Sequence, residues 1–471
     1  MKNMSTFERI FKVFRAQPPS KTPYPPETVE RDFKRWQVRV MAGMMGGYAL
    51  FYFVRKNISM ALPGMEEELG YTNTELGLLL TGTSLMYGLG KFLNGILADR
   101  ANPRFFMAIG LALSALINVA FGLSSAFWLL FLLWVLNGWV QSMGWPPCAT
   151  LLTSWYEPKR LATWWGVWNA SHQIGGALVL IMGGYLASYW GWRSIFFVPA
   201  LIAFLGCFWI IGMLRDRPEA QGFPSPYALE DATAESSSEI AQESESDSTA
   251  LDADHEEMAA WTQVRRYILT NPLIWLVSVG NLFVYIVRIG MLDWAPKFLK
   301  ESRGVNLEEA GWIVAALEIA GILGGLFAGY LADRFFKNRY SVVNSLYMLG
   351  LAGGLWFLYA SPTQGVYANA LILSVVGFLV YGPQMLAAVS AASYAPRHCA
   401  AAATGFNGLF GYLGASISGV VTGWCVDHFG WSGGVFFYFS AAILGCLSFI
   451  LAHLLHVRRH SHQDSSVMED L

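Results

Sequence analysis

Two arginines in strongly apolar surroundings are the side chains of this sequence best suited to bind a ligand. Arg55 and Arg288 share a local pattern, since Tyr52 precedes the first by three residues and Tyr285 precedes the second by three. A cation inside an apolar helix costs about 2.5–3.5 kcal/mol on membrane-insertion scales, and such residues usually serve a function. Guanidinium groups are planar, stay charged, and pair with carboxylate or phosphate oxygens. Two of them facing each other favour a dianionic tetrahedral group, as in a phosphate monoester.

The alternative role for each arginine is a salt bridge within its own part of the chain. Asp293 is a candidate partner for Arg288, but a residue five positions on lies well round a helix. No Asp or Glu occurs between residues 37 and 63, the stretch that holds Arg55. We therefore favour a shared ligand site with the two arginines on opposite sides of it.

Further polar residues fall beside Arg55 at helical spacing. Tyr48 and Tyr52 share one face of a helix with Arg55, and Tyr87 lies one turn before Lys91 in the next apolar stretch. Lys91 would add a third cation to the site. Alternatively, its long side chain extends to the membrane surface, as lysines in membrane helices commonly do.

A later apolar stretch carries a histidine. Asn169 and His172 share a helical face there, followed by Gly175 and Gly176, which allow close helix packing. His172 is either a hydrogen-bonded core residue or a group that responds to the protonation of a phosphate, since histidine titrates near neutral pH. In the second half of the chain, the polar residues to consider within apolar stretches are Glu318, Tyr381 and Tyr412. A tyrosine in such a position commonly serves packing alone.

The elements that must position these residues are transmembrane helices. The chain of 471 residues is 54% hydrophobic and 14% charged, whereas soluble domains are about one quarter charged. Its apolar residues come in blocks of about 20, the length that crosses a bilayer as a helix. We predict twelve spans, at residues 37–63, 76–98, 104–123, 128–152, 163–188, 194–214, 272–297, 309–332, 341–360, 366–392, 402–427 and 432–456.

The sequence repeats itself in two halves. Gly95-Ile-Leu-Ala-Asp99-Arg100 and Gly329-Tyr-Leu-Ala-Asp333-Arg334 are 234 residues apart, and the pairs Gly191-Trp192 and Gly430-Trp431 occupy matching positions. Parallel repeats of six helices are the plan of the major facilitator superfamily, and the repeated motif resembles its signature. We therefore predict an all-α polytopic membrane protein with twelve transmembrane helices in two pseudo-symmetric six-helix bundles. We expect structural or gating charges at the helix ends from Asp99, Arg100, Asp333 and Arg334.

The predicted order is a basic N-terminal segment (1–36), a first bundle (37–214), an acidic linker (215–264), a second bundle (265–456) and a tail (457–471). Most of the 31 Lys and Arg fall on one side of the predicted spans, so the positive-inside rule places both termini in the cytoplasm. Residues 228–258 hold eleven Asp and Glu and no Lys or Arg. This composition is typical of a flexible tether, with a docking site for a soluble partner as the alternative. Near the N-terminus, one face of a short basic helix would carry Phe7, Ile10, Phe11 and Phe14. This segment either rests on a membrane surface or forms a solvated tail.

Several other classes of protein are disfavoured. The five Cys are scattered, and no spacing indicates a disulfide framework or a metal site. The sequence shows no paired nucleophile and base and no phosphate-binding glycine loop, so we expect no enzyme, no cofactor and no metal. We also expect no nucleic-acid partner, and a monomer in the lipid bilayer.

Segments from both halves closely resemble the organophosphate:phosphate antiporter family of this superfamily. They are GYALFYFVRKN (47–57), YGLGKF (87–92), SMGWPPC (142–148), WNASHQIGG (168–176), VYIVRIGMLDWAPKFLKE (284–301), YGPQML (381–386) and GFNGLFGYLGAS (405–416). The resemblance implies a phosphate site between the halves with Arg55 and Arg288 as its arginines, His172 as its histidine and Lys91 as its lysine. It implies further substrate contacts from Tyr48, Tyr52, Tyr87, Asn169, Tyr285, Tyr381 and Tyr412. Gating or structural roles are expected for Asp293 and Glu318.

The resemblance further implies exchange of an organic phosphate ester for inorganic phosphate by alternating access in a bacterial inner membrane. The glycerol-3-phosphate branch is the most similar, whereas LLTSWY (151–156) and RDRPEAQGF (215–223) resemble the hexose-phosphate branch. A hexose-phosphate (glucose 6-phosphate) antiporter, or a transport-deficient receptor that signals to a membrane kinase, is therefore an alternative. A proton-coupled carboxylate symporter that uses Glu318 or Asp293 is another.

Overall fold

The computed structural model describes residues 14, 17–20, 28–98, 101–157, 160–225, 262, 264–337, 339–361, 365–396 and 399–469, without the side chains of residues 162, 401 and 459–469. Its first half contains α2 (Val29–Phe53), α3 (Ile58–Leu69), α4 (Asn73–Ala98), α5 (Pro103–Gly122), α6 (Phe127–Gln141), α7 (Trp145–Trp155), α8 (Leu161–Trp190) and α9 (Ser194–Met213). Its second half contains α13 (Pro272–Arg303), α14 (Leu307–Arg334), α15 (Tyr340–Ala360), α16 (Val366–Ser393) and α17 (Ala400–Glu469). The fold is all-α, as the sequence predicts.

An Asn-Pro pair begins a helix in each half. The side chain of Asn102 accepts a hydrogen bond from a first-turn backbone N–H at 3.1 Å, and Pro103 opens α5. Asn271 and Pro272 begin α13 in the same way, again at 3.1 Å. Asparagine at this position satisfies an N–H group that the helix leaves unpaired, and proline suits the first turn because it lacks that group.

Two of the predicted spans are interrupted, and two others are joined. The first span divides into α2 and α3 at residues 54–57, and the fourth divides into α6 and α7 at residues 142–144. The last two spans form α17, which bends at Gly430, where φ is +66°. Gly191, its counterpart between α8 and α9, has φ +75°. Other residues reach this backbone conformation only with strain, which explains the glycine of both Gly-Trp pairs.

Nine helical stretches of the described chain have the length and apolar composition of a membrane span. One of them, Ala402–Arg458, holds two predicted spans, one on each side of Gly430. These nine stretches do not include α2–α3 and α8, the helices that carry many of the predicted polar site residues. Counting α17 twice and adding these two gives the twelve predicted spans.

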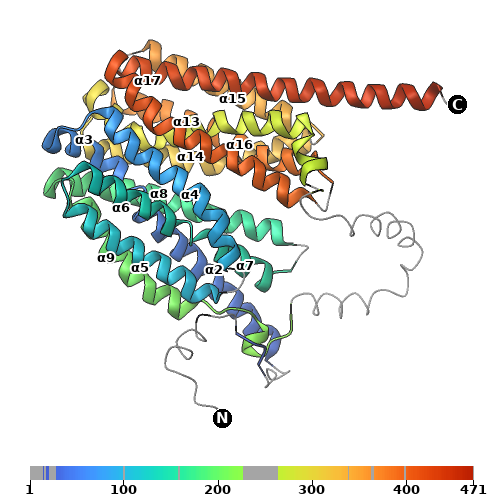
Figure 1. The fold of residues 1–471 in the computed structure, drawn as a ribbon, viewed down its shortest axis with the longest axis horizontal. Coiled ribbons are helices and arrows are strands. Elements are labelled where there is room, and N and C mark those ends of the chain that lie inside the picture. Colours follow the sequence, from blue (N-terminus) through green and yellow to red (C-terminus); the bar gives the residue numbers. More distant parts are fainter. Residues whose placement is uncertain are drawn as a thin grey trace.

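The two halves lie side by side, and two pairs of long helices form most of the contact between them (Figure 1). α4 packs along α17, and α8 packs along α14. We name the end formed by α3, the start of α4, the end of α13 and the bend in α17 the α3 end. The opposite end, where α9 ends and α13 begins, is the linker end. Glycine allows close approach at the α3 end, because a Cβ on Gly77 would lie 2.4 Å from the Gly419 carbonyl oxygen.

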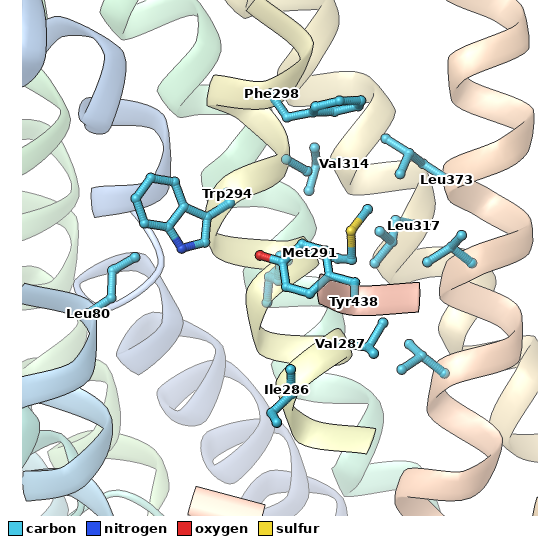
Figure 2. Packing of buried hydrophobic residues seen from close by; sticks show 14 of the residues in the cluster. Leu80, Ile286, Val287, Met291, Trp294, Phe298, Val314, Leu317, Leu373 and Tyr438 are labelled. Atoms are coloured by element: carbon cyan, nitrogen blue, oxygen red, sulfur yellow. The ribbon is translucent and has the colours of Figure 1, made fainter. Parts of the chain in front are cut away.

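The helix that carries Arg288 has a middle enclosed by protein. Figure 2 shows the apolar residues of α13 between Leu80 of α4 on one side and Val314 and Leu317 of α14 on the other. In a bilayer, such packing sets a helix against its neighbours instead of lipid. The backbone that bears Arg288 is therefore fixed from several directions.

Candidate functional site

A cavity of about 60 Å³ lies between the two halves, and Arg55 and Arg288 both line it. Four of the predicted site tyrosines also line it: Tyr52, Tyr87, Tyr285 and Tyr412. Further lining comes from residues that the sequence did not single out, including Leu80, Thr83, Ser84 and Trp134. The structure thus brings the two arginines and most of the tyrosines around one space.

Arg55 lies at the break between α2 and α3, and aromatic rings cover its charge. Its guanidinium carbon is 4.1 Å from the centre of the Tyr52 ring and 4.7 Å from that of Tyr87. Its buried Nε has no hydrogen-bond partner, and no ion pair joins it to another residue in the described part of the chain. Cation–π contacts stabilise a cation without neutralising it. Arg55 therefore presents an uncompensated positive charge to the cavity.

Arg288 has a matching aromatic setting and one polar partner. Its guanidinium carbon lies 4.7 Å from the Tyr381 ring centre and 5.7 Å from that of Tyr285. Its Nη2 donates to the Tyr381 hydroxyl at 3.3 Å, and this hydroxyl lies 2.7 Å from both carboxylate oxygens of Glu318. Because a hydroxyl has one proton, it accepts from Arg288 and donates to Glu318. The fully buried Glu318 is therefore held one hydroxyl away from the cation.

His172 lies where the two halves meet. Its ring centre is 5.5 Å from that of Tyr52 and 6.4 Å from that of Tyr381. It is 5% exposed, and its Nε2 has no hydrogen-bond partner among the described residues. A buried ring nitrogen in this position is available to a ligand or a water. Asn169, nearly one turn earlier on α8, is exposed.

Tyr48 and Lys91 lie just outside the lining of the cavity. The hydroxyls of Tyr48 and Tyr87 are 3.5 Å apart. The Lys91 ammonium lies 4.1 Å from the centre of the Trp145 ring and 5.7 Å from that of Tyr412. Because Tyr412 lines the cavity, these contacts place the charge of Lys91 near the cavity.

An ion pair that the sequence did not predict crosses between the halves beside the arginines. Lys56 Nζ lies 2.5 Å from Asp293 Oδ1, and the two side chains are 9% and 7% exposed. Asp293 therefore pairs with a lysine of the other half, and not with Arg288 on its own helix. The available signal was Lys56 itself, a second cation in the same apolar span as Arg55.

A second charged cluster joins the halves at the α3 end. Lys297 of α13 is 0% exposed and lies 2.5 Å from Glu66 and 3.1 Å from Glu301. It also donates a hydrogen bond to the side chain of Asn73. Burial raises the pKa of Glu66, and the hydrogen bond from Lys297 opposes that shift. This cluster connects α13 to both α3 and α4.

Hydrogen bonds between α4 and α17 complete the contact at this end. Both carboxylate oxygens of Asp427 accept from Asn73 and Thr74, over 2.6–3.0 Å. The Thr81 hydroxyl donates to the Ser416 carbonyl at 2.6 Å and accepts a backbone N–H of α17 at 2.9 Å. Polar links between the halves therefore gather at the α3 end, where they close the cavity.

Other predicted residues are not brought to the site. Asp99, Arg100, Phe7, Ile10, Phe11 and the acidic segment 228–258 lie outside the described residues. Asp333 and Arg334 are exposed at the end of α14, and no ion pair joins either to another described residue. The gating role expected of the repeated motif stays a prediction.

Comparison with protein families decides the class of this fold. The sequence profile of the Major Facilitator Superfamily matches residues 44–419. The chain belongs to the major facilitator superfamily. It is a polytopic membrane transporter, and its cavity lies between the halves, where transporters of this superfamily hold their substrates.

Bacterial relatives match nearly the whole of this superfamily member. A "Probable hexose phosphate transport protein" of Chlamydia muridarum is 36% identical and covers 93% of this chain and 96% of its own. A "Glycerol-3-phosphate transporter" of Bacillus subtilis is 36% identical over 88% of this chain and 91% of its own. The "Membrane sensor protein UhpC" of Escherichia coli is 35% identical, over 91% and 94%. Two of these names specify phosphate esters, and the third specifies a sensor.

Solved structures agree on the fold. An inward-facing bacterial homologue of the human lysosomal transporter Spinster has a TM-score of 0.70 at 16% identity, covering 88% of this chain and 97% of that chain. A mutant of the nucleoside transporter NupG has a TM-score of 0.63 at 15% identity, covering 88% and 99%. Likeness at this identity confirms the twelve-helix architecture of the superfamily and carries no information on substrate.

Proposed function

We propose that this transporter exchanges an organic phosphate ester for inorganic phosphate by alternating access. The observation that carries the proposal is the pair of guanidinium groups that line one cavity from opposite halves, Arg55 and Arg288. Neither forms an ion pair with a described carboxylate, because Glu318 is reached only through Tyr381 and Asp293 is paired with Lys56. The cavity therefore holds excess positive charge, which a dianionic phosphate group neutralises.

The phosphate bridges the two arginines in this proposal. Each guanidinium offers a fork of N–H donors that matches two phosphate oxygens, and the surrounding tyrosine hydroxyls and the free Nε2 of His172 add further contacts. The organic group extends toward Ser84 and Trp134, which line the cavity with the two arginines. The Ser84 hydroxyl has no hydrogen bond to another described side chain or backbone group, so it is available to a substrate hydroxyl.

Exchange follows from the charge of the site. An empty cavity that closes on both sides would bring two cations together in low-dielectric surroundings, where like charges repel strongly. Bound phosphate removes that cost, so the loaded transporter passes between its open forms more easily than the empty one. Opening the α3 end requires the Lys56–Asp293 pair and the Lys297 cluster to separate. We place both termini in the cytoplasm of a bacterium, with a monomer in its inner membrane.

Glycerol 3-phosphate is the first substrate to test, and glucose 6-phosphate is the second. The glycerol-3-phosphate transporter and the hexose phosphate protein among the relatives are equally similar to this chain, at 36% identity. The 35% identity to a membrane sensor favours one alternative function, a receptor that binds the ester without transporting it. Measuring the transport of each ester distinguishes a transporter of either substrate from a receptor.

The test is exchange in proteoliposomes loaded with labelled inorganic phosphate. External glycerol 3-phosphate, glucose 6-phosphate, unlabelled phosphate or buffer alone is added in parallel. We expect label release with phosphate and with one ester, and none with buffer. Binding of an ester without any release would replace the transporter by the receptor. Uptake of a carboxylate driven by a pH gradient, without internal phosphate, would establish the symporter.

Matched arginine variants test the observation that carries the proposal. Arg55→Lys and Arg288→Lys keep the charge but lose the planar fork. A hydrogen bond to a charged group contributes about 1.5–3 kcal/mol, so each variant should bind phosphate about 10- to 100-fold more weakly. Arg193→Lys is the control, since Arg193 pairs with Glu68 at the α3 end, away from the cavity. Full exchange by either site variant would contradict the proposed clamp.

A further inference from the structure

The two arginines are carried by different kinds of backbone. Arg288 lies in the middle of α13, which is helical from Pro272 to Arg303. Arg55 lies in the interruption at residues 54–57, which belongs to neither α2 nor α3. The apolar packing and the Tyr381 hydrogen bond hold Arg288, whereas the rings against Arg55 constrain only its side chain. The backbone N–H groups of Arg55 and Lys56 donate to the Tyr52 carbonyl at 3.3 and 2.9 Å, and side chains of neighbouring helices add further hydrogen bonds at this point.

Three side-chain amides converge on the carbonyl oxygen of the residue before Arg55. Asn118 of α5 and Asn137 of α6 each donate to the Val54 carbonyl at 2.9 Å, and Gln141 of α6 lies 3.4 Å from it. A helix supplies such a carbonyl with one backbone donor, four residues on. Here the interruption of the helix removes that donor, and neighbouring helices replace it with three side-chain amides.

These amides belong to one buried network. Gln141 donates to the Ser114 hydroxyl at 2.7 Å, and that hydroxyl donates to Asn137 at 2.5 Å. Asn57, at the far side of the break, donates to Asn118 at 2.8 Å and to a backbone carbonyl of α9 at 3.1 Å. We name the network the amide cage. Its members are at most 1% exposed: Asn57, Ser114, Asn118, Asn137 and Gln141.

General adhesion between helices does not account for this arrangement. Polar side chains commonly join membrane helices, but their contacts are then spread along an interface. Three amides of the cage instead meet at one atom, the Val54 carbonyl oxygen, which belongs to the peptide group that joins Val54 to Arg55. Since a peptide unit is planar and rigid, holding the Val54 carbonyl also fixes the start of Arg55.

We propose that the amide cage positions Arg55 for phosphate recognition, with Asn118, Asn137 and Gln141 as its positioning residues. This inference rests on the proposed function of Arg55 as one half of the phosphate clamp. Buried donors with no freedom to move maintain a geometry that the helix itself does not provide. Loss of a donor lets the backbone at residues 54–57 move. Arg55 then binds a phosphate held by Arg288 more weakly. Displacements of about 1 Å at such a site weaken function substantially.

The test compares Asn137→Leu and Gln141→Met, which keep side-chain volume and remove a donor. Equilibrium binding of labelled inorganic phosphate and of the ester is measured on the purified full-length protein. We expect Kd to rise at least tenfold for Asn137→Leu and severalfold for Gln141→Met, equally for phosphate and ester. Asn94→Leu is the control, because Asn94 is a buried amide of the same half that donates to Trp139 and Ser142 instead. It should lower the unfolding temperature as much and leave Kd unchanged.

A second readout does not depend on phosphate binding. The rate of arginine modification by phenylglyoxal, followed by peptide mass spectrometry, reports the surroundings of Arg55, with Arg288 as the internal reference. We expect the cage variants to change the ratio of the two rates at least threefold and Asn94→Leu to leave it unchanged. If the wild-type protein binds no phosphate, the proposed function is wrong. The ratio of the two modification rates then still shows whether the amide cage positions Arg55. An unchanged ratio in both cage variants, or an equal change in the control, overturns the inference.

Discussion

Replacing Asp293 by asparagine should move this transporter toward the conformation that is open at the α3 end. In the structure, Lys56 and Asp293 form a buried pair that crosses between the halves. Removing one partner of a buried pair costs about 3–5 kcal/mol, because the remaining charge has no counter-ion. We take about 3 kcal/mol for Asp293→Asn, since the amide oxygen can still accept a hydrogen bond from Lys56. When the α3 end opens, water hydrates Lys56, so the cost falls mainly on the closed conformation.

A cost of about 3 kcal/mol changes the ratio of the two conformations by about a hundredfold. An open form present at about 1% would then reach about half of the population. Spin labels at Ala126 and Ser302, which are exposed at the α3 end of the two halves, make the change measurable by pulsed electron paramagnetic resonance. Cys425 is replaced by serine first, because the other four cysteines are buried. We expect a second, longer distance in the variant.

The control removes both charges, as Lys56→Met with Asp293→Leu. Replacing a buried pair by apolar residues of similar volume is often neutral, so the double variant should return to the wild-type distance. A single variant with the wild-type distance distribution would refute the reasoning, since the pair would then not hold the α3 end closed. A double variant that matches the single one would show that the unpaired charge of Lys56 is not what opens the α3 end.

Three further outcomes follow from the same contacts. Gly77→Ala should stop the α3 end from closing and abolish exchange, since the new Cβ would lie 2.4 Å from the Gly419 carbonyl oxygen; exchange at the wild-type rate would contradict this. Ser84→Ala should weaken ester binding by about 0.5–1.5 kcal/mol, roughly two- to tenfold, and leave inorganic phosphate binding unchanged, which competition binding measures. Because burial raises the pKa of Glu66, this residue loses its charge at a higher pH than an ordinary glutamate. Acidification should therefore weaken its contact with Lys297 and lengthen the spin-label distance in wild type, while Glu66→Gln should show a smaller pH dependence.

The helical spans were predictable because a bilayer imposes a length and an apolar composition on each one. The repeated motifs then placed the twelve spans in two halves, and the family comparison confirmed that plan. The interruptions at residues 54–57 and 142–144 were not predicted. The first of them coincides with amides donated from α5 and α6, which lie more than 60 residues away in sequence. No local pattern at the break indicates them.

The sequence predicted which residues line the cavity better than it predicted which residues form ion pairs with each other. Arg55 and Arg288 line one cavity, as their matching patterns suggested. Asp293 was considered as a partner for Arg288, and the structure pairs it with Lys56 instead. Spacing along one helix could only compare Asp293 with its own neighbours. A pair between halves depends on how two bundles pack, and the sequence of either bundle does not contain that information.

The sequence by itself determined which residues are costly to bury, because a charge in an apolar span stands out from composition alone. It therefore identified Arg55 and Arg288 as candidate ligand-binding residues. It also determined the number of spans and the pseudo-symmetry that relates the two halves. Only the tertiary structure decided which of these charges are neutralised and which are free to bind a ligand. The reason is physical: neutralisation depends on distances of a few ångströms between side chains of different helices, and those distances are set when the bundles pack together. Lys56 and Lys297 are thus used to close the α3 end, while Arg55 and Arg288 keep their charge for the cavity.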